Sequence, residues 1–420
     1  MKRLFRRLHD HIYVSAGLYR LADGFTTFAA VHTAFLIFTS LQGVFINTLF
    51  MRLTGNSQLV MYYNIITNCV AGPMMIASSL IARRTSSTFS MRTGILFHIC
   101  MYITFFLSLH HLETAMPLIA ALAGLGNGCY YFSYSYILNA FSTDESRDLA
   151  ASIIGVLAGI VSLTVPALSG LVIAQFEGLT GYTVMFGVSL GMAIITILVS
   201  SKLAPVVPED RQSHLSSLLR VIREGKLYKL ILLGDFIKCT REGVCGFLFN
   251  VLLFEAITNE AIVGLNTLLA GVASILGAFI YGRLIGSKNR ILSIGASSTI
   301  LLLCASLLFI QLSPLTIILY STLNAALGPF LMNPGFSICY QHVLGSEKSR
   351  QAMAEFIGVR ECFIGLGRIC GIIFTMLMPA STSGYVTTIV LLTAAQYLMM
   401  LLFRYVQNHH AREMAEAGAA

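Results

Sequence analysis

The sequence predicts an all-α integral membrane protein whose twelve transmembrane helices form two similar six-helix halves. Of its 420 residues, 56% are hydrophobic and only 11% are charged, whereas soluble domains carry about 25% charged residues. Apolar stretches long enough to cross a bilayer recur along the whole chain, and a pattern from the first half returns in the second. Lipid must therefore be the solvent for most of the apolar surface.

Twelve apolar stretches are long enough to cross about 30 Å of hydrocarbon as helices. We expect them near residues 27–51, 57–82, 90–109, 114–139, 148–174, 181–202, 229–255, 260–284, 290–310, 314–342, 351–378 and 383–405. Several are longer than a perpendicular helix requires, which indicates tilt or helix ends that project beyond the membrane.

Lys and Arg are concentrated in every second loop, and this bias predicts the orientation. If both termini lie on one side, that side receives nearly all of the loop cations, and the opposite loops contribute only Arg52. The positive-inside rule then places both termini in the cytoplasm. The formal net charge of +8 requires no nucleic-acid partner, because topology and attraction to anionic lipid explain it.

The expected organisation has five parts. Residues 1–26 are a basic amphipathic segment on the inner leaflet, 27–202 and 229–405 are the two halves, 203–228 is a polar cytoplasmic linker, and 406–420 is a cytoplasmic tail. A signal peptide is the alternative for the first residues, and we reject it because His9, Asp10 and His11 interrupt the apolar run.

The two halves repeat each other at a constant shift of about 203 positions, estimated by matching local patterns. Gly43 and Asn47 in the first span correspond to Gly246 and Asn250 in the seventh. Similar matches occur after the fourth and tenth spans, at residues 146–147 and 349–350, and again at 154–155 and 357–358. Matches at one shift and at the same place in the topology indicate an internal duplication.

Two six-helix halves with both chain termini on the cytoplasmic side resemble the major facilitator superfamily, and the resemblance covers nearly the whole chain. Residues 177–191 (EGLTGYTVMFGVSLG) are similar to its bacterial YqgE-like permeases. This resemblance implies a location in a bacterial cytoplasmic (inner) membrane, a central cavity between the halves and alternating access by rocking. Of the superfamily signature after the second span, the chain has the basic pair Arg83–Arg84 but lacks the acidic residue. Residues 165–170 (VPALSG) in the fifth span are a degraded version of a motif associated with exporters, which favours export.

Seven charged side chains lie inside apolar segments of the second half, whereas the spans of the first half carry no such cluster. Four fall in the seventh span and three in the eleventh: Asp235, Lys238, Arg241, Glu242, Arg360, Glu361 and Arg368. A charge at the membrane centre costs at least a few kcal/mol, so such residues normally face a protein interior or a water-filled path. With a rise of about 1.5 Å per residue from the cytoplasmic start of each span, both groups lie at a similar depth in the membrane. We therefore expect them to form one site.

The predicted site binds an anion. Arg241, Arg360 and Lys238 are the candidate ligands, because guanidinium groups suit carboxylate and phosphate. Glu242 or Glu361 is the candidate proton carrier, because burial and substrate can shift its protonation.

Two further expectations concern how these charges are arranged. Asp235 is expected near the cytoplasmic mouth, in contact with water. The alternative to a binding site is mutual neutralisation, with Lys238–Glu242 within one helix and Arg241–Glu361 or Arg360–Glu242 between helices. A purely structural contact would more cheaply be apolar, which favours the binding site.

Tyrosines of the fourth span are candidates for the opposite wall of the cavity. Tyr130 and Tyr134 are the predicted substrate contacts, with Tyr131 and Tyr136 nearby. A wall of this kind suits an amphiphilic or ring-bearing substrate, and ordinary helix–helix hydrogen bonding is the alternative. His32 is expected to be a packing residue.

No catalytic motif occurs: the sequence has neither G-x-x-x-x-G-K-[ST] nor H-E-x-x-H. Nine cysteines lie in the spans without a C-x-x-C pair, so no cofactor, disulfide framework or zinc site is expected. The sequence therefore predicts a monomeric secondary transporter, not an enzyme, that moves a small organic anion or amphiphile with proton coupling. The bilayer and the small-molecule substrate are its expected partners. A lipid or glycolipid flippase and a non-transporting membrane partner protein remain the alternatives.

Overall fold

The computed structural model describes residues 21–54, 57–142, 147–173, 175–176, 180–208, 210–256, 260–286, 289–310, 313–344, 351–379 and 381–418. Most of the predicted N-terminal segment 1–26 lies outside this part of the chain. The helices are α2 (Phe25–Thr54), α3 (Ser57–Arg84), α4 (Ser87–Leu107), η2 (Leu109–His111), α5 (Leu112–Ala140), α6 (Arg147–Ile173), α7 (Thr180–Ser200), α8 (Leu215–Glu224), α9 (Lys226–Ala256), α10 (Glu260–Leu284), α11 (Arg290–Ile310), α12 (Pro314–Leu344), α14 (Met353–Leu377), α15 (Thr382–Ala394) and α16 (Gln396–Gly418).

Each predicted span coincides with a long helix to within a few residues, and the last span covers α15 and part of α16. Within the described residues, six helices are long and apolar enough to cross a membrane, beginning at residues 58, 87, 180, 290, 314 and 382. Helices α9 and α14 are not among these six, and both carry the charged residues that lower their apolar character. The number of twelve crossings therefore stays a prediction.

The helix boundaries repeat at the shift found in the sequence. A shift of about 203 residues, as internal duplications produce, moves Ser87–Leu107 of α4 onto the bounds of α11 at Arg290–Ile310. The same shift moves the start of α3 onto the start of α10 and brings α5 to within one residue of the start of α12. The repeated sequence thus has a repeated structure.

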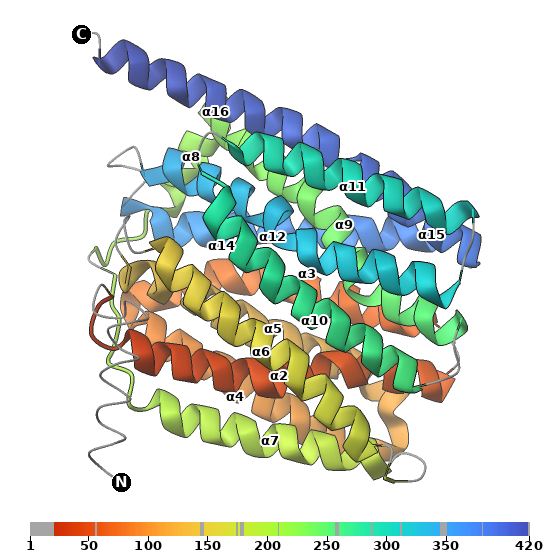
Figure 1. Cartoon of the computed structure of the whole chain (residues 1–420). Helices are drawn as coiled ribbons and strands as arrows, with labels where there is room; N and C mark the ends of the chain where they lie inside the picture. The colour runs from red at the N-terminus through yellow and green to blue at the C-terminus, as the bar shows by residue number, and fades with distance from the viewer. Residues whose placement is uncertain are drawn as a thin grey trace, which may run out of the picture.

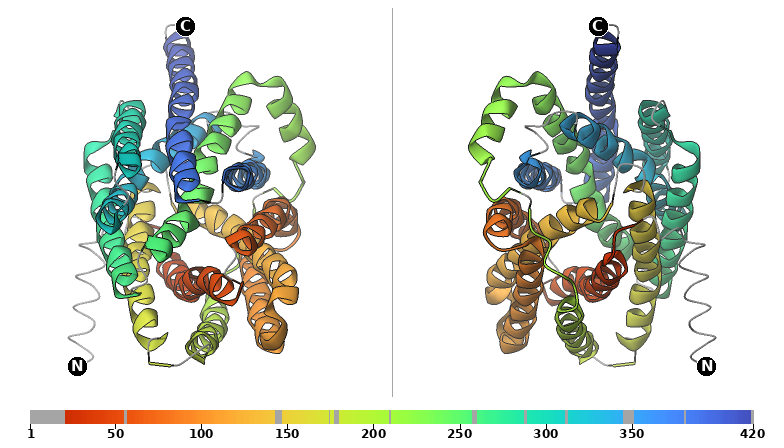
Figure 2. Two further views of the ribbon diagram at one scale, coloured as in Figure 1. Left: turned by 90° about the vertical axis from the view of Figure 1, so that its right-hand side faces the viewer. Right: turned by 90° about the vertical axis from the view of Figure 1, so that its left-hand side faces the viewer.

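The long helices run side by side along a common direction (Figure 1). Helices of the first half pack against those of the second along two seams, α3 against α14 and α6 against α10. The views along the bundle show these two seams on opposite sides of its middle (Figure 2). Helix α8 and the C-terminal end of α16 lie at one end of the bundle, which we call the linker end.

Helices α9 and α14 are in backbone contact, and glycines make this possible. A Cβ atom at Gly371 would lie 2.0 Å from the carbonyl oxygen of Thr240, and one at Gly367 would lie 2.3 Å from that of Phe236. No larger residue fits at these positions without moving the helices apart. The contact brings the charged residues of the two helices within reach of one another.

The linker is bound to the first half before it reaches the second. The Ser87 backbone N–H donates to the Val206 carbonyl at 2.8 Å, and the Thr88 hydroxyl donates to the Ala204 carbonyl at 3.0 Å. Helix α8 follows and contacts α9 and α14, burying Leu218. Its apolar positions share one face, as expected of an amphipathic helix.

Candidate functional site

The centre of the charged cluster is Asp235 of α9, whose side chain is 0% exposed. Its carboxylate accepts a hydrogen bond from Lys238 Nζ at 2.7 Å. It also accepts bonds from Arg360 of α14, from Nε at 2.6 Å and from Nη2 at 3.2 Å. The expectation that Asp235 contacts water is wrong, because its side chain is fully buried against Lys238 and Arg360.

A second ion pair forms the accessible edge of the cluster. Arg368 Nη2 lies 3.0 Å from Glu242 Oε1, and these side chains are 35% and 38% exposed. The Cys239 thiol donates to the other oxygen of Glu242 at 3.3 Å. Glu242 is therefore paired with Arg368. The neutralisation alternative expected it to pair with Lys238 or Arg360, and neither of these pairs forms.

Glu361 is the most loosely held carboxylate of the cluster. Its nearest cationic atom is Arg360 Nη1 at 3.7 Å, and its side chain is 20% exposed. The Arg360 atoms Nε and Nη2 already donate to Asp235, so the remaining attraction to Glu361 is weaker. No hydrogen bond to Glu361 occurs within the described residues.

Arg241 is a buried cation held by neutral oxygen atoms. Its Nε donates to the Thr393 hydroxyl of α15 at 3.1 Å. Its Nη2 donates to the Tyr320 hydroxyl at 3.1 Å and to Asn324 Oδ1, both on α12. Within the described part of the chain, no carboxylate lies within 4.0 Å of Arg241, so the expected Arg241–Glu361 pair does not form.

The cluster therefore has two parts and one unmatched charge. Asp235 neutralises part of the charge of Lys238 and Arg360 in the interior, while Glu242 pairs with Arg368 at the accessible edge. With four cations and three carboxylates, Arg241 is the cation that geometry leaves without a counter-charge. No group of three His, Cys, Asp or Glu side chains suited to a metal occurs among the described residues.

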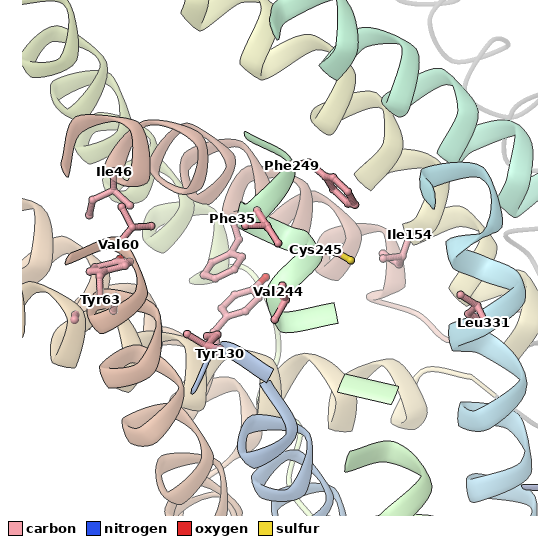
Figure 3. Close-up of a cluster of buried hydrophobic side chains, with 14 of the residues drawn as sticks. Phe35, Ile46, Val60, Tyr63, Tyr130, Ile154, Val244, Cys245, Phe249 and Leu331 are labelled. Atoms are coloured by element: carbon pink, nitrogen blue, oxygen red, sulfur yellow. The ribbon is translucent and has the colours of Figure 1, made fainter. Parts of the chain in front are cut away.

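The predicted contact Tyr130 lies inside an aromatic cluster of the first half. Its side chain is fully buried, and its ring stacks on Phe35 with 3.3 Å between centroids, as Figure 3 shows. Its hydroxyl lies 3.1 Å from His32 Nδ1. Tyr134 is partly exposed and stacks on His32 with 4.2 Å between centroids. Tyr130 is therefore closed to any molecule outside the protein in this structure, whereas part of Tyr134 is accessible.

Tyr131 connects this aromatic cluster with the charged cluster. It is partly exposed, and its ring is perpendicular to that of Phe35 at 5.7 Å. It lies close enough to Arg368 and Glu361 to interact with both electrostatically. Neither Tyr131 nor Arg368 was a predicted substrate contact. The sequence did place Arg368 on the same helix face as Glu361, because the two are seven residues apart.

A separate ion pair joins the two halves at the linker end. Arg83, at the end of α3, pairs with Glu355, in the first turn of α14. The Arg83 Nη2 atom lies 2.6 Å from Glu355 Oε2, and both side chains are buried, at 3% and 0% exposure. The acidic partner missing from the sequence around Arg83 is thus supplied from the second half.

The linker residue Asp210 carries its own contacts beside this pair. The Gln212 backbone N–H and the His214 ring hold the pKa of Asp210 below its usual range. The His214 ring nitrogen Nε2 contacts Asp210 Oδ2. Asp210 therefore stays ionised at neutral pH.

No family model matches the sequence, whereas individual proteins do. The chain is 26% identical over 341 residues to the uncharacterized protein YqgE of Bacillus subtilis, across 81% of this chain and 79% of that protein. It is also 23% identical over 147 residues to a protein encoded in the sodM 3′ region of Geobacillus stearothermophilus, across 35% of this chain and 69% of that protein.

Solved structures of transporters share the fold. The E. coli fucose:proton symporter FucP superposes with a TM-score of 0.69 at 11% identity, covering 91% of this chain and 98% of that chain. A bacterial homologue of the iron transporter ferroportin, in an outward-facing state, superposes with a TM-score of 0.67 at 14% identity, covering 92% and 99%. The resemblance found in the sequence is confirmed: the chain is a multi-pass membrane protein with the fold of major facilitator superfamily transporters, and its sequence is similar to that of YqgE.

Proposed function

We propose that this protein is a secondary transporter that moves a small organic anion across the membrane by alternating access. The observation that supports this most strongly is Arg241, a buried guanidinium with neutral partners and no carboxylate within 4.0 Å among the described residues. Helix packing alone would be achieved more cheaply with apolar residues. A buried cation without a counter-charge is expected where an anion binds.

The accessible edge is the proposed first binding step. An anion that enters between the halves meets Arg368 and Glu242, both about one-third exposed, opposite Tyr131 of the other half. A carboxylate or phosphate replaces Glu242 on the Arg368 guanidinium, which suits both groups. Arg241 then supplies the positive potential deeper in the second half. Lys238 and Arg360 contribute mainly through their charge, because Lys238 Nζ and the Nε and Nη2 atoms of Arg360 already donate to Asp235.

Glu361 is the proposed proton carrier, in preference to Glu242. Glu242 accepts bonds from Arg368 and Cys239, whereas the nearest cation to Glu361 among the described residues is Arg360 at 3.7 Å. An ionised carboxylate with weak compensation is the one most readily protonated in a partly desolvated site. Protonation of Glu361 makes the cluster more positive and therefore strengthens its attraction for an anion.

The link between Glu361 protonation and anion binding bears on the direction of transport. If protonation strengthens anion binding, the proton and the anion move together, which an inward proton gradient would use for uptake. The degraded motif at residues 165–170 favours export instead. We favour the direction that follows from charge balance, and a transport assay with an imposed pH gradient distinguishes the two.

The test combines binding with transport. Purified protein is screened for thermal stabilisation by monocarboxylates, dicarboxylates and phosphate esters, and stabilising anions are then assayed in proteoliposomes. Arg368→Gln and Arg241→Gln should lose stabilisation and uptake, while Arg84→Gln, an exposed residue outside the site, should retain both. Anion binding that is unchanged in both site variants would refute the assignment.

A further inference from the structure

We propose that the linker segment 210–214 is a strap that holds the linker end closed by binding directly to the Arg83–Glu355 ion pair. This inference uses the alternating-access part of the proposed function and identifies gating residues that act together with the linker. Its test measures conformation and not transport, so it can fail or succeed independently of any substrate.

Five hydrogen bonds converge on this ion pair from three segments of the chain. Arg83 donates twice to the Glu355 carboxylate and once to the Gln351 carbonyl, at 2.8 Å. The linker provides the other two: Arg83 Nη1 donates to the Asp210 carbonyl, and the His214 backbone N–H donates to Glu355 Oε1 at 3.1 Å. The linker therefore contacts both members of the pair, one from each half.

The surroundings of the pair show that α3 and α14 are packed together at this end of the molecule. Met75 and Ala82 of α3 pack with Ala354 and Ile357 of α14 in one buried apolar cluster. Opening at the linker end must separate these helices, break the ion pair and expose the cluster. The buried pair would then lose its partner charges, which is costly unless water replaces them.

The linker is anchored on both sides of this contact. On one side, the Val206 backbone is hydrogen-bonded to the Ser87 N–H and the Thr88 hydroxyl at the start of α4. On the other side, Leu218 is buried where α8 contacts α9 and α14. Eight residue steps separate Val206 from His214. A chain of this length reaches about 26–29 Å when fully extended, so it allows the halves to separate once its two bonds to the pair are broken.

The side chains of the strap support its folded shape. Asp210 accepts a hydrogen bond from the Gln212 N–H at 2.7 Å and contacts the His214 ring. These contacts form a compact turn that presents the Asp210 carbonyl and the His214 N–H to the ion pair. The charged groups that face this turn are Arg83 from α3 and Glu355 from α14, together with Asp210 and His214 themselves.

The test measures opening by maleimide labelling of Ala354→Cys, a buried position in the apolar cluster. Labelling is taken as the increment over the parent protein, which keeps its native cysteines. A Gly-Ser-Gly-Ser insertion between Gln212 and Ser213 detaches the strap without changing the ion pair. The matched control is the same insertion before Gly286, an exposed residue in the α10–α11 connection at the same end.

The strap insertion should increase the labelling rate at least about tenfold, because two hydrogen bonds to charged groups are lost and each alone is expected to contribute about that factor. Arg83→Gln should increase it further, whereas Arg84→Gln and the control insertion should leave it unchanged. If Arg83→Gln opens this end but the strap insertion does not, the linker is passive and the proposal is wrong. If Arg83→Gln does not fold, the exchange Arg83→Glu with Glu355→Arg replaces it, and an unchanged rate in the strap insertion still overturns the proposal.

Discussion

The most demanding test of the charged cluster is Asp235→Asn, which removes one negative charge and changes the side-chain volume very little. In the structure this carboxylate is 0% exposed and contacts two cations, Lys238 at 2.7 Å and Arg360 at 2.6 Å. The amide that replaces it still accepts one hydrogen bond but compensates neither charge. Lys238 would then be a buried cation with a neutral partner, and Arg360 would retain only the looser attraction to Glu361 at 3.7 Å.

The expected loss of stability follows from burial. Removing one partner of a buried ion pair costs about 3–5 kcal/mol, because the remaining charge is uncompensated. Here one carboxylate serves two cations, so we expect the upper part of that range. The comparison variant is Glu242→Gln, which breaks a pair with side chains more than one-third exposed. Solvent screens such a pair, and its loss should cost about 0–1 kcal/mol.

The assay is reversible unfolding in mixed micelles of a mild detergent and SDS, with the two variants measured under identical conditions. A triple variant, Asp235→Leu with Lys238→Met and Arg360→Met, provides a further check. Because apolar replacement of a buried ion pair is often neutral or stabilising, this variant should recover most of the lost stability. Equal free energies of unfolding for Asp235→Asn and Glu242→Gln would refute the assignment of Asp235 as the buried centre.

Three further outcomes follow from the geometry. Gly371→Leu should destabilise the protein by about 1–3 kcal/mol or more through overpacking, since even a Cβ atom there would lie 2.0 Å from the Thr240 carbonyl oxygen. An unfolding curve equal to that of the parent protein would contradict this contact. Glu361→Gln should retain counterflow exchange but lose uphill, pH-driven movement, and normal pH dependence would exclude it as the proton carrier. Ser216→Cys, an exposed linker position on α8, should label only from the cytoplasm, and labelling from outside would reverse the orientation.

The helices could be predicted from the sequence because lipid imposes a simple requirement on them. A segment that crosses hydrocarbon must be apolar over most of its length and must bond its own backbone. The bounds of α11, at Arg290–Ile310, coincide with the predicted stretch for this reason. The duplication was also visible in the sequence, because the two halves preserve the same spacing of helices.

The pairing of the charges could not be predicted, because it depends on how each helix is rotated about its axis. Spacing along α9 places Asp235, Lys238 and Glu242 on one face, but it does not tell which of them meets α14. The close contact at Gly367 and Gly371 decides this by bringing Arg360 onto Asp235. The link between Arg83 and Glu355 joins residues 272 positions apart, and no local pattern around Arg83 indicates its partner.

The glycine contact between α9 and α14 has a consequence for how such a molecule can switch. Because the two helices touch through their backbones, we expect them to move as one body, and the buried pairs that Asp235 makes between and within them stay unbroken. The large electrostatic terms of Asp235, Lys238 and Arg360 are then the same in both states and cancel from the difference between them. A few contacts between the bodies, such as Arg83 with Glu355, can then decide which state is populated.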